Sequence, residues 1–282
     1  MGGVLKALLA ALLAAAVLAG TALAPVPAAG SPAPTTDGTI DAPAAGLGSR
    51  PPAWLGTREL PRTETGFGEV RPTPPALRHR RWTLPDTVPT LRGRGYRAKV
   101  VSPAPARVVA RSTWQEGCPV AANELAWVRV KFWGFDHRAH TGELLVHVRA
   151  ADDVAAVFGT LFRQRFPQEQ VVILRSHDPD APPTGDGNAT SAFECRPTVG
   201  ASYFSQHAHG LALDLNPFQN PYVKGDVLLP ELAGAYLRRD RVRPGMVVAA
   251  GPVVAAFARI GWEWGGDWNS ATDYQHFSEN GR

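Results

Sequence analysis

An alternation of side chains around residue 213 constrains the fold of this chain more than any other feature of the sequence. In Gly210-Leu211-Ala212-Leu213-Asp214-Leu215-Asn216, every second residue is a leucine. Because successive side chains of a strand point to opposite faces, the leucines can enter a core while Asp214 faces the other way. The small side chains of the segment leave room beside that carboxylate. The pattern therefore predicts a half-buried strand that presents an acid to a site.

Two other periodicities recur along the chain. Alternating or continuous apolar runs, typical of strands, lie at 128–132, 143–148 and 171–174. Apolar residues at helical spacing follow Asp152 and Asp153, either of which can cap the helix, and Pro167 blocks its continuation. Gly251-Pro252 opens a second, short helix over 253–260. We expect an α+β fold, with a small antiparallel sheet flanked by helices in a single domain.

The first 28 residues have the features of a secretory signal peptide. Lys6 precedes an apolar run from Ala7 to about Ala24, and small residues follow. Pro25 disfavours cleavage directly after Ala24, so we expect cleavage after Ala28. An uncleaved membrane anchor is the alternative, because the run nearly reaches the length that spans a bilayer. The expected product is exported and has no stable membrane span after cleavage.

Residues 29–95 are rich in Pro, Ala, Thr, Gly and Arg, which predicts a largely disordered tether before a folded domain over 96–282. The net charge of +4 favours an anionic partner without naming one. No dense run of Lys and Arg is interleaved with aromatic residues, so we expect no nucleic-acid partner.

Cys118 and Cys195 are the only cysteines. In an exported protein two thiols usually form one disulfide. Their wide separation does not resemble the C-x-x-C spacing of metal or redox sites, which makes paired metal or catalytic thiols the weaker alternative. We expect a Cys118–Cys195 disulfide.

Two histidines and one acid in the last third of the chain form a candidate metal site. His207 lies shortly before Asp214, as in a loop that leads into a strand, and His276 arrives from a distant segment. Two imidazoles and a carboxylate are suitable zinc ligands, and three protein ligands leave a fourth position open for water. His209 could compete with His207 as the first ligand.

The residues around these ligands resemble two blocks of a known family. Ser205-Gln206-His207-Ala208-His209-Gly210-Leu211-Ala212-Leu213-Asp214 matches all five fixed positions of S-x-H-x-x-G-x-A-x-D, the signature of the zinc D-Ala-D-Ala carboxypeptidases and L-alanyl-D-glutamate endopeptidases. Trp264-Gly265-Gly266-Asp267-Trp268 and Asp273-Tyr274-Gln275-His276-Phe277 resemble the second block, W-G-G-D-W…D-x-x-H-F. The resemblance extends over roughly 128–277 and leaves the tether outside.

The resemblance implies that His207, Asp214 and His276 bind one zinc ion per chain and that Asp273 is the catalytic acid and base. An arginine before the first block commonly stabilises the oxyanion in this family. Arg175, followed by Ser176, resembles that arginine and is our preferred candidate. Arg196 is its rival, because it follows Cys195 and could be fixed by the disulfide.

The expected function is that of a secreted, cell-wall-associated zinc peptidase that hydrolyses amide bonds in peptidoglycan stem peptides. The sequence does not separate a D-Ala-D-Ala carboxypeptidase from an L-Ala-D-Glu endopeptidase, although Asp rather than Glu at position 273 is similar to the endopeptidase branch. Two alternatives stay open. A non-haem iron enzyme also uses two histidines and a carboxylate, and a non-catalytic wall-binding protein could retain a vestigial metal site.

Overall fold

The computed structural model describes residues 50–175, 181–198 and 201–281. All of the described residues belong to one compact unit. The predicted signal peptide and residues 29–49 of the predicted tether lie outside the described residues. Within the described ranges, no helix is long and apolar enough to cross a membrane.

The largest sheet is built on a long hairpin. β2 (Leu125–Gly134) pairs antiparallel with β3 (Ala139–His147) and, on its other side, with β1 (Ala98–Val101). The short strand β4 (Pro167–Gln168) adds a parallel pairing to the end of β2. Both strands of the hairpin were predicted from the apolar runs. The run at 171–174 differs from its prediction, because only Val171 forms a bridge, with Thr190.

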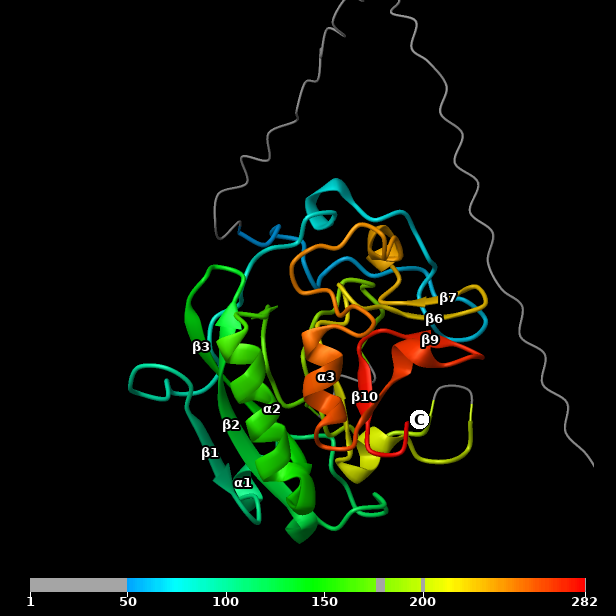
Figure 1. The fold of residues 1–282 in the computed structure, drawn as a ribbon. Coiled ribbons are helices and arrows are strands. Elements are labelled where there is room, and N and C mark those ends of the chain that lie inside the picture. Colours follow the sequence, from blue (N-terminus) through cyan, green and yellow to red (C-terminus); the bar gives the residue numbers. More distant parts are fainter. Residues whose placement is uncertain (1–49, 176–180, 199–200, 282) are drawn as a thin grey trace, which may run out of the picture. The chain divides into compact units, whose positions relative to one another are not determined.

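One face of this sheet is covered by α2 (Ala151–Arg163), which lies along β1 and β2 in Figure 1. Val154, Phe158 and Leu161 are fully buried beneath it. Asp152 and Asp153 lie inside the first helical turn and do not cap it, so their charges stabilise the helix through its dipole. The short helix α1 (Ala106–Val109) lies at the end of β1.

Two more three-stranded sheets follow. One has the order β5 (Ala212–Asp214), β10 (His276–Ser278), β8 (Glu263–Trp264), and the other the order β7 (Val227–Leu229), β6 (Tyr222–Lys224), β9 (Thr272–Asp273). The helix α3 (Pro252–Ala258) packs on the first through Phe257, which stacks on Phe277 at 3.9 Å between ring centroids. The described residues therefore mix α-helices with three small sheets, one of which includes a parallel pairing, where one small antiparallel sheet was expected.

Six short 3-10 helices complete the described secondary structure. They are η1 (Pro75–Leu77), η2 (Ala122–Glu124), η3 (Val148–Ala150), η4 (Gln206–His209), η5 (Ala233–Tyr236) and η6 (Gly265–Asp267).

Residues 50–95 are packed against the domain, in contrast to the disordered tether expected over 29–95. Leu77 and Trp82 are 0% and 3% exposed, in a cluster with Phe218 and Tyr236 from the C-terminal half. The prediction of disorder was wrong here because it rested on the average composition of the segment, which hides its few large apolar side chains. A few well-placed large side chains suffice to bury an irregular chain whose prolines have no N–H group that needs a partner.

A buried ion pair fixes this N-terminal segment. Arg80 donates two hydrogen bonds to the Glu169 carboxylate, at 2.6 and 2.7 Å, and a third to the carbonyl oxygen of Asp186 at 2.6 Å. The two side chains are 2% and 0% exposed. Asn188 donates another hydrogen bond to Glu169. The pair joins the segment to the loop that precedes the candidate site.

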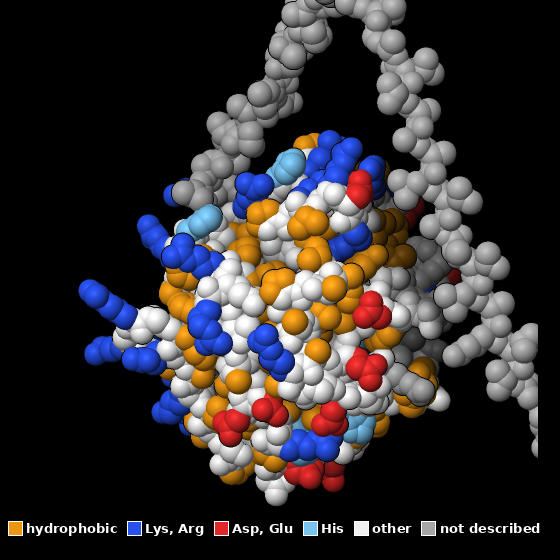
Figure 2. Space-filling view, in the orientation of Figure 1, with side chains coloured by type: hydrophobic (Ala, Val, Ile, Leu, Met, Phe, Trp, Pro, Cys, Tyr) orange, Lys and Arg blue, Asp and Glu red, His pale blue; other side chains and the backbone are white. Residues whose placement is uncertain are grey.

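Basic side chains gather on the loop that runs into β1. Arg92, Arg94, Arg97 and Lys99 are all exposed, and Figure 2 shows Lys and Arg side chains projecting on that side of the molecule. The loop and β1 therefore carry a local group of solvent-exposed positive charges.

Arg80→Met should reduce the free energy of unfolding by about 3–5 kcal/mol, because it leaves the Glu169 carboxylate buried without its partner. The matched control is Arg71→Met, which breaks an exposed pair with Glu69 and should change stability by less than about 1 kcal/mol. Denaturant titration at neutral pH measures both. Equal stabilities for the two variants would show that the N-terminal segment is not part of the cooperative fold.

Candidate metal centre

His207 lies in a short helical turn whose ends are determined by the flanking residues. The Ser205 side chain accepts a hydrogen bond from the His207 N–H at the start of η4. The turn ends at Gly210, in the left-handed conformation with φ 67°. A Cβ at that position would lie 2.5 Å from the backbone nitrogen of His147. The serine and the glycine of the first motif are therefore required by the backbone around the ligand.

The other two candidate ligands are cross-strand neighbours. Asp214 of β5 lies directly opposite His276 of β10 in the antiparallel register. Asp214 also exchanges two backbone hydrogen bonds with Ser191, at 2.8 and 3.1 Å. Residues in such a pair project to the same face of the sheet, so strand pairing alone brings the carboxylate and the imidazole together.

The three candidate ligand atoms form a nearly equilateral triangle. His207 Nε2 lies 3.1 Å from His276 Nδ1 and 3.2 Å from Asp214 Oδ1, and the last two atoms are 3.1 Å apart. Ligands held tetrahedrally at about 2.0–2.2 Å from a zinc ion are roughly 3.3–3.6 Å apart, slightly more than these separations. The cluster is the one group of three or more His, Cys, Asp or Glu side chains in the described ranges that could hold a metal ion. The donor set and its spacing fit zinc.

A backbone contact orients the first ligand. His207 Nδ1 lies 2.6 Å from the carbonyl oxygen of Ala192. With the proton on Nδ1, this nitrogen donates to the carbonyl and the lone pair of Nε2 points into the cluster. Hydrogen bonds of this kind orient metal-binding histidines and increase their basicity.

The charges of the cluster depend on one another. Burial opposes ionisation of Asp214, but His207 and His276 outweigh it and hold the pKa of this carboxyl far below its usual range. Burial also lowers the pKa of His207, but the Asp214 carboxylate outweighs burial and raises the pKa above its ordinary value. A negative charge fixed between two imidazoles attracts either protons or a cation.

Asp273 lies buried beside this cluster, on β9. Among the described residues its Oδ1 has no hydrogen-bond partner. Burial and the nearby Asp214 charge raise the pKa of Asp273 to about 7. A Cβ at Gly265 would lie 2.8 Å from the Asp273 carbonyl oxygen, so the W-G-G-D-W segment packs tightly against this acid because it has glycine there.

The structure places the two candidate arginines differently. Arg175 is exposed and immediately precedes residues 176–180, which the structure does not describe. The Arg196 side chain is 31% exposed, and its charge is close enough to interact with those of both Asp214 and Asp273. It donates from Nε to Glu194 at 2.6 Å. Burial lowers the pKa of Arg196, but Glu194 outweighs it and raises that pKa.

Some residues of the site had no signal in the sequence. Glu194, which holds Arg196, lies two residues before it, and no motif in the sequence points to it. Tyr222, which lies opposite Asp273 in the β6–β9 register, is another such residue. Trp268 belongs to the second motif block and lies beside His276, with ring centroids 5.3 Å apart. The Ala192 carbonyl is a backbone group, so its contact with His207 depends on the fold and on no particular side chain.

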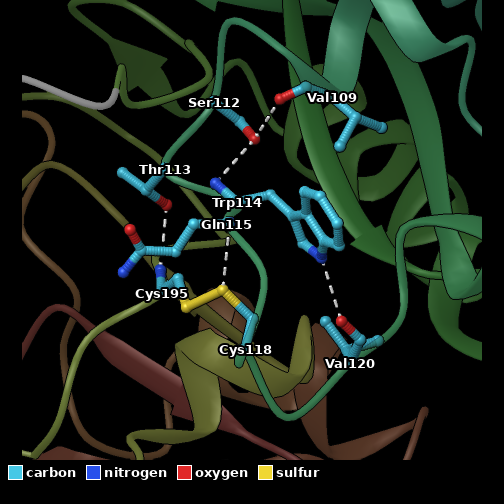
Figure 3. The surroundings of a disulfide bond; sticks show 8 residues. All are labelled: Val109, Ser112, Thr113, Trp114, Gln115, Cys118, Val120 and Cys195. Atoms are coloured by element: carbon cyan, nitrogen blue, oxygen red, sulfur yellow. Dashed lines mark hydrogen bonds between the residues drawn. A yellow bond between two sulfur atoms is a disulfide. The ribbon is translucent and has the colours of Figure 1, made fainter.

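The structure joins Cys118 and Cys195 in a disulfide, as expected from the two thiols. The bridge ties the loop after α1 to the segment that carries Glu194 and Arg196. Figure 3 shows its surroundings. His209 ends η4 and lies outside the triangle of candidate ligands.

Two histidines and a carboxylate with a second acid beside them form the kind of centre that metal-dependent hydrolases use. Residues 199–279 match the sequence model of the family described as D-alanyl-D-alanine carboxypeptidase. This match confirms the family resemblance over the segment that carries the two motif blocks. It includes both motif blocks and neither candidate arginine. No curated protein and no solved structure matches the chain significantly.

His207→Ala, Asp214→Ala and His276→Ala should each weaken zinc binding by at least about 100-fold, since even the loss of a group that only orients a ligand costs 10- to 100-fold. His209→Ala is the control and should bind zinc as the unaltered chain does. Competition titration against a chelator of known affinity measures the dissociation constants. Undiminished binding in the His276 variant would refute the ligand set.

Proposed function

We propose that the chain is a zinc-dependent peptidase that hydrolyses amide bonds in peptidoglycan stem peptides. The observation that supports this most strongly is the triangle of His207, Asp214 and His276 with the buried acid Asp273 beside it. The family match over both motif blocks supports the same reaction class and substrate. Zinc, when bound there, supplies Lewis-acid chemistry that polarises the scissile carbonyl and makes water nucleophilic near neutral pH.

Asp273 serves as the general base and then the general acid. Its carboxylate removes a proton from the attacking water and delivers it to the departing amine nitrogen, so that the amide C–N bond breaks without expelling an amide anion. Its burial and its unpartnered Oδ1 support this role, because a proton acceptor needs a free lone pair facing the reacting atoms. A cation bound next to it would favour the ionised form that a base requires.

Arg196 stabilises the carbonyl oxygen as it becomes negative. Its charge acts on the site, since it interacts with Asp214 and Asp273, and Glu194 holds the guanidinium through Nε. Nη1 also donates one hydrogen bond to the Pro197 carbonyl oxygen at 3.2 Å, and the other N–H groups of the guanidinium are donors suited to an oxyanion. We therefore prefer Arg196 to Arg175, which the sequence had favoured for the same role.

Export and the choice of bond belong to the same proposal. The N-terminal signal features and the disulfide both fit an oxidising compartment outside the cytoplasm. The two bonds considered are D-Ala-D-Ala and L-Ala-D-Glu. Mass spectrometry of defined muropeptides distinguishes them directly, because the first cleavage releases a single alanine and the second divides the stem.

Asp273→Asn should retain zinc and fold normally, yet lose about 10²–10⁴ of the turnover number, because the amide is not a base. Metal content, circular dichroism and muropeptide hydrolysis are measured on the same preparation. Full activity in a zinc-loaded Asp273→Asn variant would show that another group transfers the proton.

Arg196→Ala should reduce kcat by about 10²–10³, the cost of losing one oxyanion donor. Arg175→Ala is the matched comparison and should leave kcat within about twofold. Both variants should keep their zinc. The reverse ranking of the two arginines would return the role to Arg175.

A further inference from the structure

Arg196 lies on a segment with little regular structure of its own. In residues 192–197, Phe193 donates a backbone hydrogen bond to Leu145 of β3 and Glu194 donates one to His207. Further along, the backbone N–H of Arg196 donates only to the Glu194 carbonyl, two residues back, and the Arg196 carbonyl accepts from the Ser205 N–H. Pro197 forms an isolated bridge with Phe204. Residues 192–196 belong to no strand. Backbone pairing to the large sheet thus stops before the arginine.

The disulfide attaches this segment to the rest of the domain next to the arginine. Cys195 precedes Arg196 and is bonded to Cys118, 77 residues earlier. The Cys195 N–H also donates to Thr113 Oγ1 at 2.9 Å. In Figure 3 both attachments lead to the same loop, 112–118.

That loop is a rigid support. Ser112 Oγ donates to the Val109 carbonyl at 2.7 Å and accepts from the Trp114 N–H at 3.1 Å. The Trp114 indole donates to the Val120 carbonyl at 3.0 Å. Val108 and Val109 of α1 and Val120 belong to a buried cluster, against which both cysteines pack. The bridge therefore joins the segment before Arg196 to a buried part of the fold.

The candidate metal ligands do not depend on this bridge. Asp214 and His276 are held by the β5–β10 pairing. His207 is held by η4 and by the Ala192 carbonyl, which lies on the side of Phe193 away from the disulfide. Without the bridge, the segment keeps its backbone contacts to His207 and Ser205 and the Cys195–Thr113 hydrogen bond, but it loses its covalent attachment next to Arg196. The contacts of the candidate ligands remain.

We infer that the Cys118–Cys195 disulfide is a positioning element that holds Arg196 at the metal centre. Hydrolysis then requires the oxidised form of the protein, whereas zinc binding does not. This inference rests on the proposed function of the site. Misplacement of a reacting group by about 1 Å can cost 100-fold in rate. A shift of Arg196 after loss of the bridge therefore lowers kcat strongly. If the bridge only stabilised the fold, its removal would change kcat by the same factor whether or not Arg196 is present.

A double-mutant cycle separates these two roles. It compares the unaltered chain, Cys118→Ser/Cys195→Ser, Arg196→Ala and the triple variant, all loaded with zinc and assayed well below their melting temperatures. Removing the bridge should lower kcat about tenfold or more when Arg196 is present, and by less than about twofold when it is Ala. Zinc affinity should stay unchanged in both backgrounds. Equal losses in the two backgrounds, or no loss in either, overturn the inference.

Two controls keep the result decisive. Val109→Ala weakens the same buried cluster without touching the bridge, so it should lower the melting temperature while kcat stays within about twofold. If the serine variant does not fold, phosphine reduction of the folded protein replaces it, with thiol counting to verify the reduction and reoxidation to restore kcat. Failure of the unaltered, zinc-loaded chain to cut muropeptides would instead refute the proposed function.

Discussion

The pairing of β5 with β10 is the constraint on which the rest of the site depends. It sets Asp214 opposite His276 on one face, while Leu213 and Phe277, paired in the same register, are both fully buried on the other. A slip by one residue would send the carboxylate into the core and the apolar pair toward the metal. Burial of apolar area thus fixes the register, and the register fixes two of the three candidate ligands. The alternation that predicts the strand therefore also determines the geometry of the cluster.

A second support carries the candidate base. Asp273 belongs to a different sheet from the candidate ligands Asp214 and His276, one in which β9 pairs with β6 and β6 with β7. The region after β7 packs through Tyr236 against Trp82 and Leu77 of the N-terminal segment. Asp214 and His276 therefore depend on a different part of the core from Asp273. This arrangement agrees with separate roles, in which binding of the metal and transfer of the proton can be lost independently.

The sequence predicted what is determined locally and failed where tertiary packing decides. Ser205 and Gly210 shape the turn around His207 through backbone contacts, and a short motif records them. The sequence predicted the Cys118–Cys195 disulfide and named Arg196 beside it. That Arg196 lies close enough to interact with Asp214 and Asp273 depends on tertiary packing, which no local pattern encodes. The expected tether failed over 50–95 because a single ion pair, Arg80 with Glu169, and a few large side chains order a segment of unfavourable composition.

The most direct test of this account is mass spectrometry of defined muropeptides incubated with the metal-free protein, and again after addition of one equivalent of zinc. The account predicts intact muropeptides in the first sample and cleavage of one stem-peptide amide bond in the second. Intact muropeptides with the folded, zinc-loaded protein, or equal cleavage before and after zinc is added, would contradict it.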